Sequence, residues 1–130
     1  MLIVEDEPSI REVLEDLFDV PGVEVASASA LDTGLALLRG RSFDLVITDI
    51  RLGGNRDGGL QVMAAAGLLS PDAGVVALTA FPDDDNRHAS ARLGAAHFIE
   101  KPAPLERIAE VAAIYGVPTA ISRRLPGVPG

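Results

Sequence analysis

The sequence predicts an α/β domain built on a doubly wound sheet of five parallel strands. Short apolar runs alternate with segments of helical periodicity, and this pattern repeats five times along most of the chain. The run at 43–52, FDLVITDIRL, has the continuous, β-branched character of a strand buried on both faces. Strands joined through helices pair in parallel by right-handed crossovers. We predict the strand order 2-1-3-4-5, with the less apolar second strand at an edge.

The first two strand–helix units are predicted between residues 2 and 40. Leu2–Val4 is a short apolar strand, and Pro8 suits the first turn of the helix that follows it. Val23–Ala26 is predicted as the second strand, and Ser29 with Asp32 resembles a capping box at the start of the second helix. The expected apolar stripes are Ile10, Val13, Leu14, Leu17 and Phe18 in the first helix, and Leu31, Leu35 and Leu38 in the second.

The last three units begin with the strand in FDLVITDIRL. A glycine-rich loop at 52–59 leads into the third helix, and Gly74–Thr79 is the fourth strand. The acids Asp83–Asp85 favour the start of a fourth helix, and Ala96–Ile99 is the fifth strand. The expected stripes are Leu60, Met63, Ala64 and Leu68 in the third helix, Ala89 and Leu93 in the fourth, and Leu105, Ile108, Ala109 and Ala112 in the fifth.

The composition is that of one globular domain with an acidic surface. Hydrophobic residues make up 48% of the chain and charged residues 23%, and 130 residues are enough to bury a core. The 19 acidic and 11 basic residues give a net charge of −8, which argues against direct nucleic acid binding and suits a cation or a basic protein surface. We predict one domain at 1–115 and a Pro/Gly-rich tail or linker at 116–130.

Residue types and segments that the chain lacks narrow its function further. There is no cysteine, so disulfides, zinc thiolates and cysteine nucleophiles are excluded. The opening MLIVEDE meets acids after a short apolar run, unlike a signal peptide. No stretch reaches the ~18 apolar residues of a membrane helix. The expectation is a cytoplasmic protein that does not associate with a membrane.

Four predicted strands end in side chains that can carry chemistry. Glu5 and Asp6 follow the first strand, Asp49 the third, Thr79 the fourth and Lys101 the fifth. The carboxyl ends of parallel strands share one edge, and the strand order reverses between the first and third strands. The acids therefore flank the crevice in which such sheets bind ligands.

Three carboxylates in one crevice repel one another unless their negative charge is neutralised. Two carboxylates ~4 Å apart repel by about 4 kcal/mol at an effective dielectric of about 20. Either their pKa values rise or a cation holds them together. Oxygen ligands without His or Cys suit Mg²⁺, which also binds phosphate. With Lys101 and Thr79 as donors, the set has the components for phosphoryl transfer to Asp49.

The chain resembles the response-regulator receiver domain of two-component signal transduction over residues 1 to about 115. Asp49 lies 30 residues before Thr79, which lies 22 residues before Lys101. Order, spacing and strand-end placement are specific together, although each motif alone is weak. The resemblance implies a flavodoxin-like (βα)5 fold. The motifs that carry the resemblance are LIVEDE at 2–7, DLVITDIRL at 44–52, ALTA at 77–80 and FIEKP at 98–102.

The resemblance implies a phosphoryl acceptor and a metal site. Asp49 would accept a phosphoryl group from the phosphohistidine of a sensor histidine kinase or a histidine phosphotransfer protein. Asp6 and Asp49 would bind Mg²⁺ directly, and Glu5 through water. The backbone carbonyl of Arg51 would be another ligand. The domain would not be an enzyme beyond its own phosphotransfer and autodephosphorylation.

The resemblance also implies a switch. Thr79 and Lys101 would bind the phosphoryl oxygens, and Phe98 would turn inward when Thr79 is drawn toward the phosphoryl group. Phe98 also fits as an ordinary core aromatic. The Lys101–Pro102 peptide would be cis. The face of the fourth helix, fifth strand and fifth helix would change, and a homodimer through this face is a further expectation.

The loop after Asp49 departs from the family pattern. The family commonly has Met-Pro where this chain has Leu52 and Gly53, and an Asp-Gly pair that here comes late, at 57–59, with an extra glycine. We expect this loop to be longer and more mobile than is usual.

Other classes of function fit parts of the pattern. A haloacid-dehalogenase-type phosphohydrolase also uses a strand-end Asp and Mg²⁺, but wants a second Asp where this chain has Arg51. A receiver fold acting as a phosphate-independent interaction module would bind its partner equally well without the Asp49 carboxylate. A flavodoxin-like FMN protein has less support, because no Ser/Thr-rich phosphate loop follows the first strand.

Overall fold

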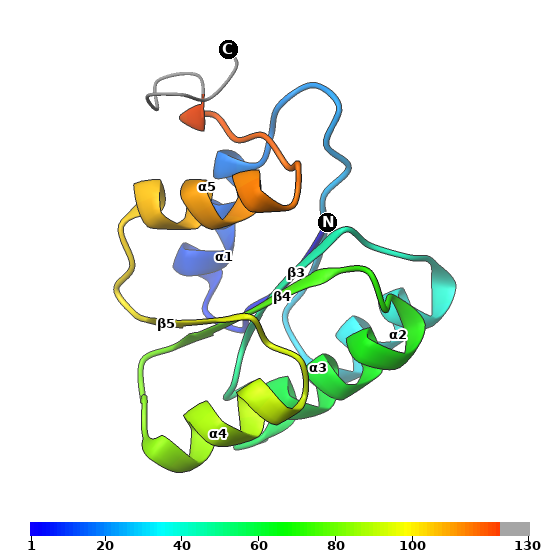
Figure 1. Ribbon diagram of the computed structural model, residues 1–130, viewed down its shortest axis with the longest axis vertical. Helices are drawn as coiled ribbons and strands as arrows, with labels where there is room; N and C mark the ends of the chain where they lie inside the picture. Colours follow the sequence, from blue (N-terminus) through cyan, green and yellow to red (C-terminus); the bar gives the residue numbers. More distant parts are fainter. Residues whose placement is uncertain (123–130) are drawn as a thin grey trace.

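The computed structural model describes residues 1–122 and contains a five-stranded parallel sheet with five helices (Figure 1). The strand order is β2-β1-β3-β4-β5, which confirms the predicted topology. The strands are β1 (Leu2–Val4), β2 (Ala26–Ala28), β3 (Leu45–Asp49), β4 (Gly74–Thr79) and β5 (His97–Glu100). The helices are α1 (Pro8–Leu17), α2 (Leu31–Gly40), α3 (Gly58–Leu69), α4 (Asp84–Arg92) and α5 (Leu105–Ile114).

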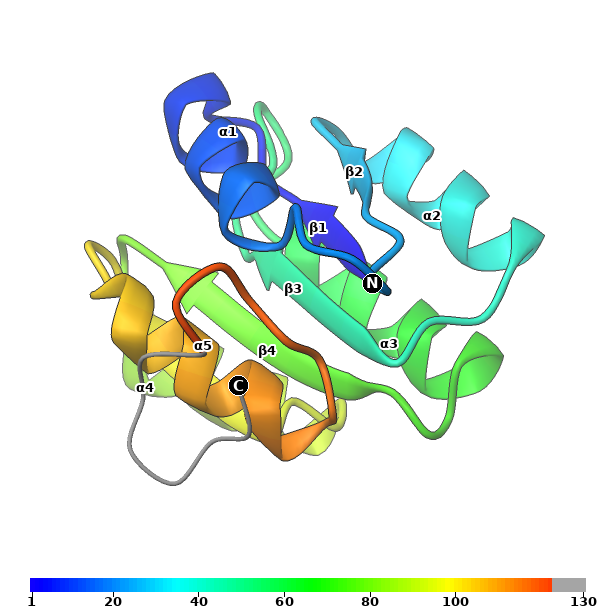
Figure 2. The same ribbon diagram turned by 90° about the horizontal axis from the view of Figure 1, so that it is seen from above.

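Helices cover both faces of the sheet, with α1 and α5 on one side and α2, α3 and α4 on the other (Figures 1 and 2). Alternate residues of each buried strand therefore enter different cores. Ile3, Ile47 and Val76 pack with α1 and α5, whereas Val46 and Ala77 pack with α2 and α3. All five residues of β3 are buried, as expected of a central strand covered on both faces.

The strand β2 begins three residues later than predicted, at Ala26. Its register is set by pairing with β1, in which Leu2 lies beside Ala26 and Val4 beside Ala28. The two valines that favoured 23–26 precede the strand and are only partly buried against the α1 side. The predicted capping box is also wrong: Ala30 precedes α2, and no side chain caps the helix.

The helix α3 buries only part of the predicted stripe, since Met63 is buried and Leu60 packs partly against the core. It begins at Gly58 and buries Val62, Met63 and Ala66, whereas Leu68 is 83% exposed. The helix has no charged residue to mark its solvent face, so hydrophobic periodicity could not orient it.

The described part of the predicted tail packs against the domain. Gly116 has φ of 75°, which turns the chain back after α5, and Val117 is buried in the α1–α5 core. The backbone N–H of Ala120 donates to the Leu17 carbonyl at 2.8 Å, which satisfies an acceptor at the end of α1. The rest of the predicted tail, 123–130, lies outside the described residues. Within 1–122, no helix has the length and apolar character needed to span a membrane.

Candidate functional site

Three carboxylates meet at the carboxyl edge of the sheet. Glu5 follows β1 and Asp49 ends β3, and these strands are neighbours with Val4 paired to Thr48. One carboxylate oxygen from each of Glu5, Asp6 and Asp49 lies within 4.8 Å of the others. Glu5 is 1% exposed and Asp49 9% exposed, whereas Asp6 is more accessible. The structure thus brings the three predicted acids together.

Lys101 joins this cluster from the end of β5. Its Nζ donates to Oδ2 of Asp49 at 2.8 Å and also to Oε1 of Glu5. The Lys101–Pro102 peptide bond is cis. The backbone N–H of Lys101 donates to the Thr79 carbonyl at 2.7 Å, which connects the loop after β5 to the end of β4. One ammonium therefore faces two buried carboxylates.

Burial raises the pKa of Glu5 to about 7, even though the hydrogen bond and positive charge of Lys101 act in the opposite direction. Burial alone would lower the pKa of Lys101, but its hydrogen bonds to Asp49 and Glu5 outweigh that effect and raise it. The ammonium thus stays charged, while Glu5 takes up a proton more readily than an ordinary glutamate does.

The donor set fits a hard divalent cation. Oε2 of Glu5 is buried and has no hydrogen-bond partner among the described residues. Such a group is costly to bury unless a ligand or ion satisfies it. Oδ2 of Asp6 accepts the Gly53 N–H at 2.9 Å, which places its carboxylate between β1 and the loop after β3. Three oxygen donors with one ammonium leave excess negative charge, which Mg²⁺ would neutralise.

Thr79 lies beside the acids at the end of β4. Asp49 pairs with Leu78, so Thr79 is one residue beyond the level of Asp49 on the neighbouring strand. It is 1% exposed, and its Oγ1 accepts the backbone N–H of Phe81 at 3.0 Å. Because the oxygen is the acceptor there, the hydroxyl proton can still be donated to a ligand. The exposed Ala80 next to it is small and leaves the approach open.

The loops around the site are joined by an arginine–aromatic contact that sequence reasoning missed. The guanidinium carbon of Arg51 lies 4.3 Å from the centre of the Phe81 ring, although Phe81 is 56% exposed. This contact connects the loop after β3 with the loop after β4. The signal in the sequence was an aromatic two residues after Thr79 in a chain with only 4% aromatic residues.

The glycine-rich loop after β3 is a compact, hydrogen-bonded turn. Leu52 and Asn55 exchange two backbone hydrogen bonds of 2.9 and 3.0 Å, and Gly53 between them has φ of 61°. The Gly59 N–H donates to the Ile50 carbonyl at 2.8 Å. A Cβ on Gly59 would lie 1.8 Å from the Asp49 carbonyl oxygen, so this position has no room for a side chain. The greater mobility expected of this loop stays a prediction.

Phe98, predicted as a switch residue, is half-buried on β5. It packs beside the core on the α2–α3 side, and the Arg87 guanidinium carbon lies 4.5 Å from its ring centre.

The two histidines do not form a pair: His88 is exposed, and His97 contacts Tyr115 with Nε2 3.1 Å from the phenol oxygen.

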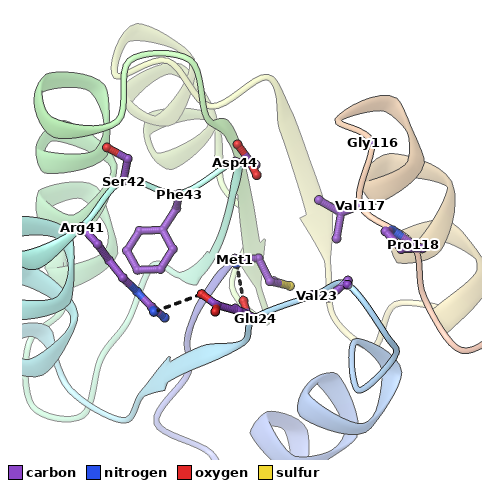
Figure 3. Close-up of a pocket in the computed structure, with 11 residues that line it drawn as sticks. Met1, Val23, Glu24, Arg41, Ser42, Phe43, Asp44, Gly116, Val117 and Pro118 are labelled. Carbon is purple, nitrogen blue, oxygen red and sulfur yellow. Dashed lines mark hydrogen bonds and ion pairs between the residues drawn. The ribbon is translucent and has the colours of Figure 1, made fainter.

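A cavity of about 520 Å³ lies at the opposite, amino-terminal edge of the sheet (Figure 3). Its wall includes Met1, Glu24, Arg41 and Val117. Arg41 pairs with Glu24 at 3.6 Å, and the Met1 amine donates to the Glu24 carbonyl at 2.6 Å. The Arg41 and Glu24 side chains pair with each other and are 44% and 90% exposed, unlike the buried groups around Asp49.

Comparison with known proteins places these features in a family. The model described as "Response regulator receiver domain" matches residues 1–113. Response regulator protein PilR of Pseudomonas aeruginosa is 35% identical over 126 residues, which are 96% of this chain and 26% of PilR. The chain spans about a quarter of the length of such curated relatives.

Solved structures give the same result. The receiver domain of NtrX from Brucella abortus has a TM-score of 0.75 and 32% identity, covering 88% of this chain and 95% of that one. A response regulator protein from Burkholderia pseudomallei, solved with a phosphorylated aspartic acid, a calcium ion and citrate, has a TM-score of 0.75 and 25% identity. That match covers 88% of this chain and 69% of the other.

Proposed function

This chain belongs to the response regulator receiver domain family, and we propose that Asp49 accepts a phosphoryl group from a phosphohistidine donor. The observation that carries the proposal is the placement of Asp49 at the end of β3, where Lys101 binds its Oδ2 at 2.8 Å beside two further carboxylates. The phosphorylated aspartic acid of the Burkholderia pseudomallei relative supports it.

In the transfer step, a carboxylate oxygen of Asp49 attacks phosphorus and the bond from phosphorus to the donor imidazole breaks. The electron pair of that bond leaves with the imidazole, and an acyl phosphate forms on Asp49. Lys101 orients the carboxylate before the reaction and offers its positive charge to the phosphoryl oxygens afterwards. The buried hydroxyl of Thr79 is the second donor.

We propose Mg²⁺ as the cofactor. Glu5, Asp6 and Asp49 would hold it, with the Arg51 carbonyl as a further ligand, and the bound ion would neutralise charge on the phosphoryl group. The unpartnered oxygen of Glu5 supports this assignment. The calcium ion in the Burkholderia pseudomallei structure shows that a hard divalent cation binds in that relative.

We propose that phosphorylation changes the face formed by α4, β5 and α5, through Thr79 and Phe98. Sensor histidine kinases or histidine phosphotransfer proteins would be the donors, in the cytoplasm, and a homodimer through this face is one output. The domain would otherwise catalyse only its own phosphotransfer and autodephosphorylation. Family membership does not favour a phosphohydrolase.

Labelling by acetyl phosphate tests the acceptor. We expect the protein to gain one Mg²⁺-dependent phosphoryl group that Asp49→Asn abolishes, because the amide is not a nucleophile. Asp57→Asn is the matched control, since Asp57 is an exposed acid in the loop after β3. Labelling that persists in Asp49→Asn would refute the assignment, and equal partner binding by wild type and Asp49→Asn would favour the interaction-module alternative.

A further inference from the structure

Arg87 on α4 stacks on the half-buried ring of Phe98. Its guanidinium carbon lies 4.5 Å from the ring centre, within the ~6 Å range of cation–π attraction. Phe98 is partly buried and Arg87 is exposed, so the guanidinium covers the solvent side of the ring. Turning the ring away from this position would break the contact.

Arg87 contacts the Phe98 ring although acidic side chains are close to it in the sequence. Three acids, Asp83–Asp85, precede it by two to four residues at the start of the same helix. Among residues 1–122, Arg87 forms no ion pair with any of them. Asp83 instead caps the helix by accepting the Asn86 N–H at 2.7 Å. The guanidinium is therefore held by the Phe98 ring.

Phe98 and Thr79 share one face of the sheet. Phe98 pairs with Ala77 on β4, and paired residues of neighbouring strands point to the same side, as do residues two apart on one strand. Ala77 is small, and Thr79 follows it on that face. The space beside Ala77 and Thr79 is thus the place toward which the ring would turn.

Contacts along the β4–α4 loop link Thr79 to the helix that carries Arg87. Oγ1 of Thr79 accepts the Phe81 N–H, and the Phe81 carbonyl accepts the side-chain amide of Asn86 at 3.5 Å. Asn86 immediately precedes Arg87. A movement of the Thr79 hydroxyl toward a phosphoryl group would reach the α4 turn from which Arg87 extends.

We propose that Arg87 is a positioning residue that holds Phe98 in its outward, half-buried orientation and thereby sets the resting balance of the switch. This inference rests on the proposed function. Any state in which Phe98 turns toward Thr79 loses the Arg87 contact, so the outward state is favoured by the free energy of that contact. A phosphoryl group on Asp49 must overcome this bias, and reciprocally removal of Arg87 strengthens phosphoryl-mimic binding.

The test is a titration of the full chain with beryllofluoride in saturating Mg²⁺, with the ring resonances of Phe98 followed by NMR. We expect Arg87→Ala to bind beryllofluoride about fivefold more tightly, a factor equal to about 1 kcal/mol. Arg87→Lys keeps the charge but loses the planar guanidinium, so we expect its beryllofluoride affinity to lie between those of the wild type and Arg87→Ala. Arg92→Ala is the matched control, because Arg92 is an exposed arginine on the same helix.

A double-mutant cycle separates stacking from charge. In Phe98→Leu, Arg87→Ala is expected to leave beryllofluoride affinity unchanged, because the ring is absent. The Phe98 resonances of the unliganded protein should shift in Arg87→Ala and not in Arg92→Ala. Equal beryllofluoride affinities for Arg87→Ala and Arg92→Ala would refute the role of Arg87, and so would an Arg87→Ala effect of the same size with and without Phe98. Neither result would contradict the proposed function. Failure of the wild type to bind beryllofluoride would overturn the proposed function and this inference together.

Discussion

Lys101 is bound to two carboxylates whose environments differ. It contacts Asp49, which ends β3 beside the crevice, and Glu5, which is 1% exposed. A single ammonium compensates one buried negative charge well and two incompletely, so a proton on Glu5 or a divalent cation completes the neutralisation. The same residue therefore couples the protonation of Glu5 to the environment of the proposed acceptor.

The stability of the metal-free protein should depend on pH through Glu5. Its folded-state pKa is raised from 4.5 to about 7, so the folded protein holds the proton more tightly than the unfolded chain does. The resulting stabilisation is fully present below pH 4.5 and is lost as the pH rises to about 7. We expect the free energy of unfolding, measured with urea in chelator, to fall by roughly 3 kcal/mol across this window.

The variant Glu5→Gln should flatten this pH dependence, because the amide does not titrate. Glu12→Gln, an exposed acid on α1, is the matched control for loss of one charge. Saturating Mg²⁺ should also flatten the dependence by binding the charged form. A slope of the same size in Glu5→Gln would show that another group carries it.

At the residue scale, sequence reasoning found the groups that stand at strand ends. Asp49, Thr79 and Lys101 could be predicted because parallel strands bring their carboxyl ends to one edge. The contacts of Arg51 with Phe81 and of Arg87 with Phe98 could not be, because they depend on where loops and a helix turn place long side chains. Periodicity carries no information about such distances.

At the scale of elements, the turn after β3 determines how closely α3 approaches the acceptor strand. Gly59 in the first turn of α3 lies against the backbone of Asp49 and Ile50, and a Cβ there would lie 1.8 Å from the Asp49 carbonyl oxygen. The contact is with backbone, which cannot rotate away as a side chain can. The extra glycine in this loop is thus needed for close packing beside Asp49.

Substitution of Gly59 by alanine should displace either α3 or the end of β3. We expect Gly59→Ala to lower the free energy of unfolding by about 3 kcal/mol, the upper part of the range for overpacked sites, and to slow labelling by acetyl phosphate. Gly54→Ala is the control in the loop that precedes α3, since a Cβ there meets nothing within 4 Å. Denaturant unfolding would measure both, and equal stability of the two variants would contradict the steric account.

The boundaries of an element could be predicted where the apolar pattern and the flanking turn residues agreed. The strand β4 was predicted correctly at Gly74–Thr79, because an apolar run lies between clear turn residues. The second strand was misplaced because β-propensity favoured Val23 and Val25, whereas pairing with β1 selects Ala26–Ala28. For α3 the composition is nearly uniform, and only tertiary packing decides which side is buried.

At the scale of the whole molecule, the proposed switch residues and an apolar groove lie on opposite sides of the sheet. Phe98 and Arg87 lie on the side of α2, α3 and α4. On the other side an apolar groove of about 480 Å³ runs between α1 and the loop after β5, lined by Val13, Ala80 and Pro102 among others. Lys101 also lines it, so the groove leads to the site. A donor that docks in this groove could present its phosphohistidine to Asp49 without covering the switch.

Docking in this groove predicts a variant that distinguishes protein donors from small ones. Val13 is 46% exposed on α1, and Val13→Glu would place a charge in the groove. We expect phosphotransfer from a phosphorylated histidine phosphotransfer domain to slow about tenfold, or about 1.4 kcal/mol, as is typical for loss of a central apolar contact. Labelling by acetyl phosphate should stay unchanged, because that donor needs no groove.

Leu68→Glu provides the matched control for this docking prediction. Leu68 is 83% exposed on α3, on the opposite side of the sheet, so the same charge there should not affect transfer from the protein donor. The ratio of the two transfer rates, measured by radiolabelled phosphotransfer, isolates the groove from the general effect of one more negative charge on a chain of net charge −8. If both variants slow transfer equally, the transfer rate depends on the net charge of the chain, and the α1 groove is not the docking surface of the donor.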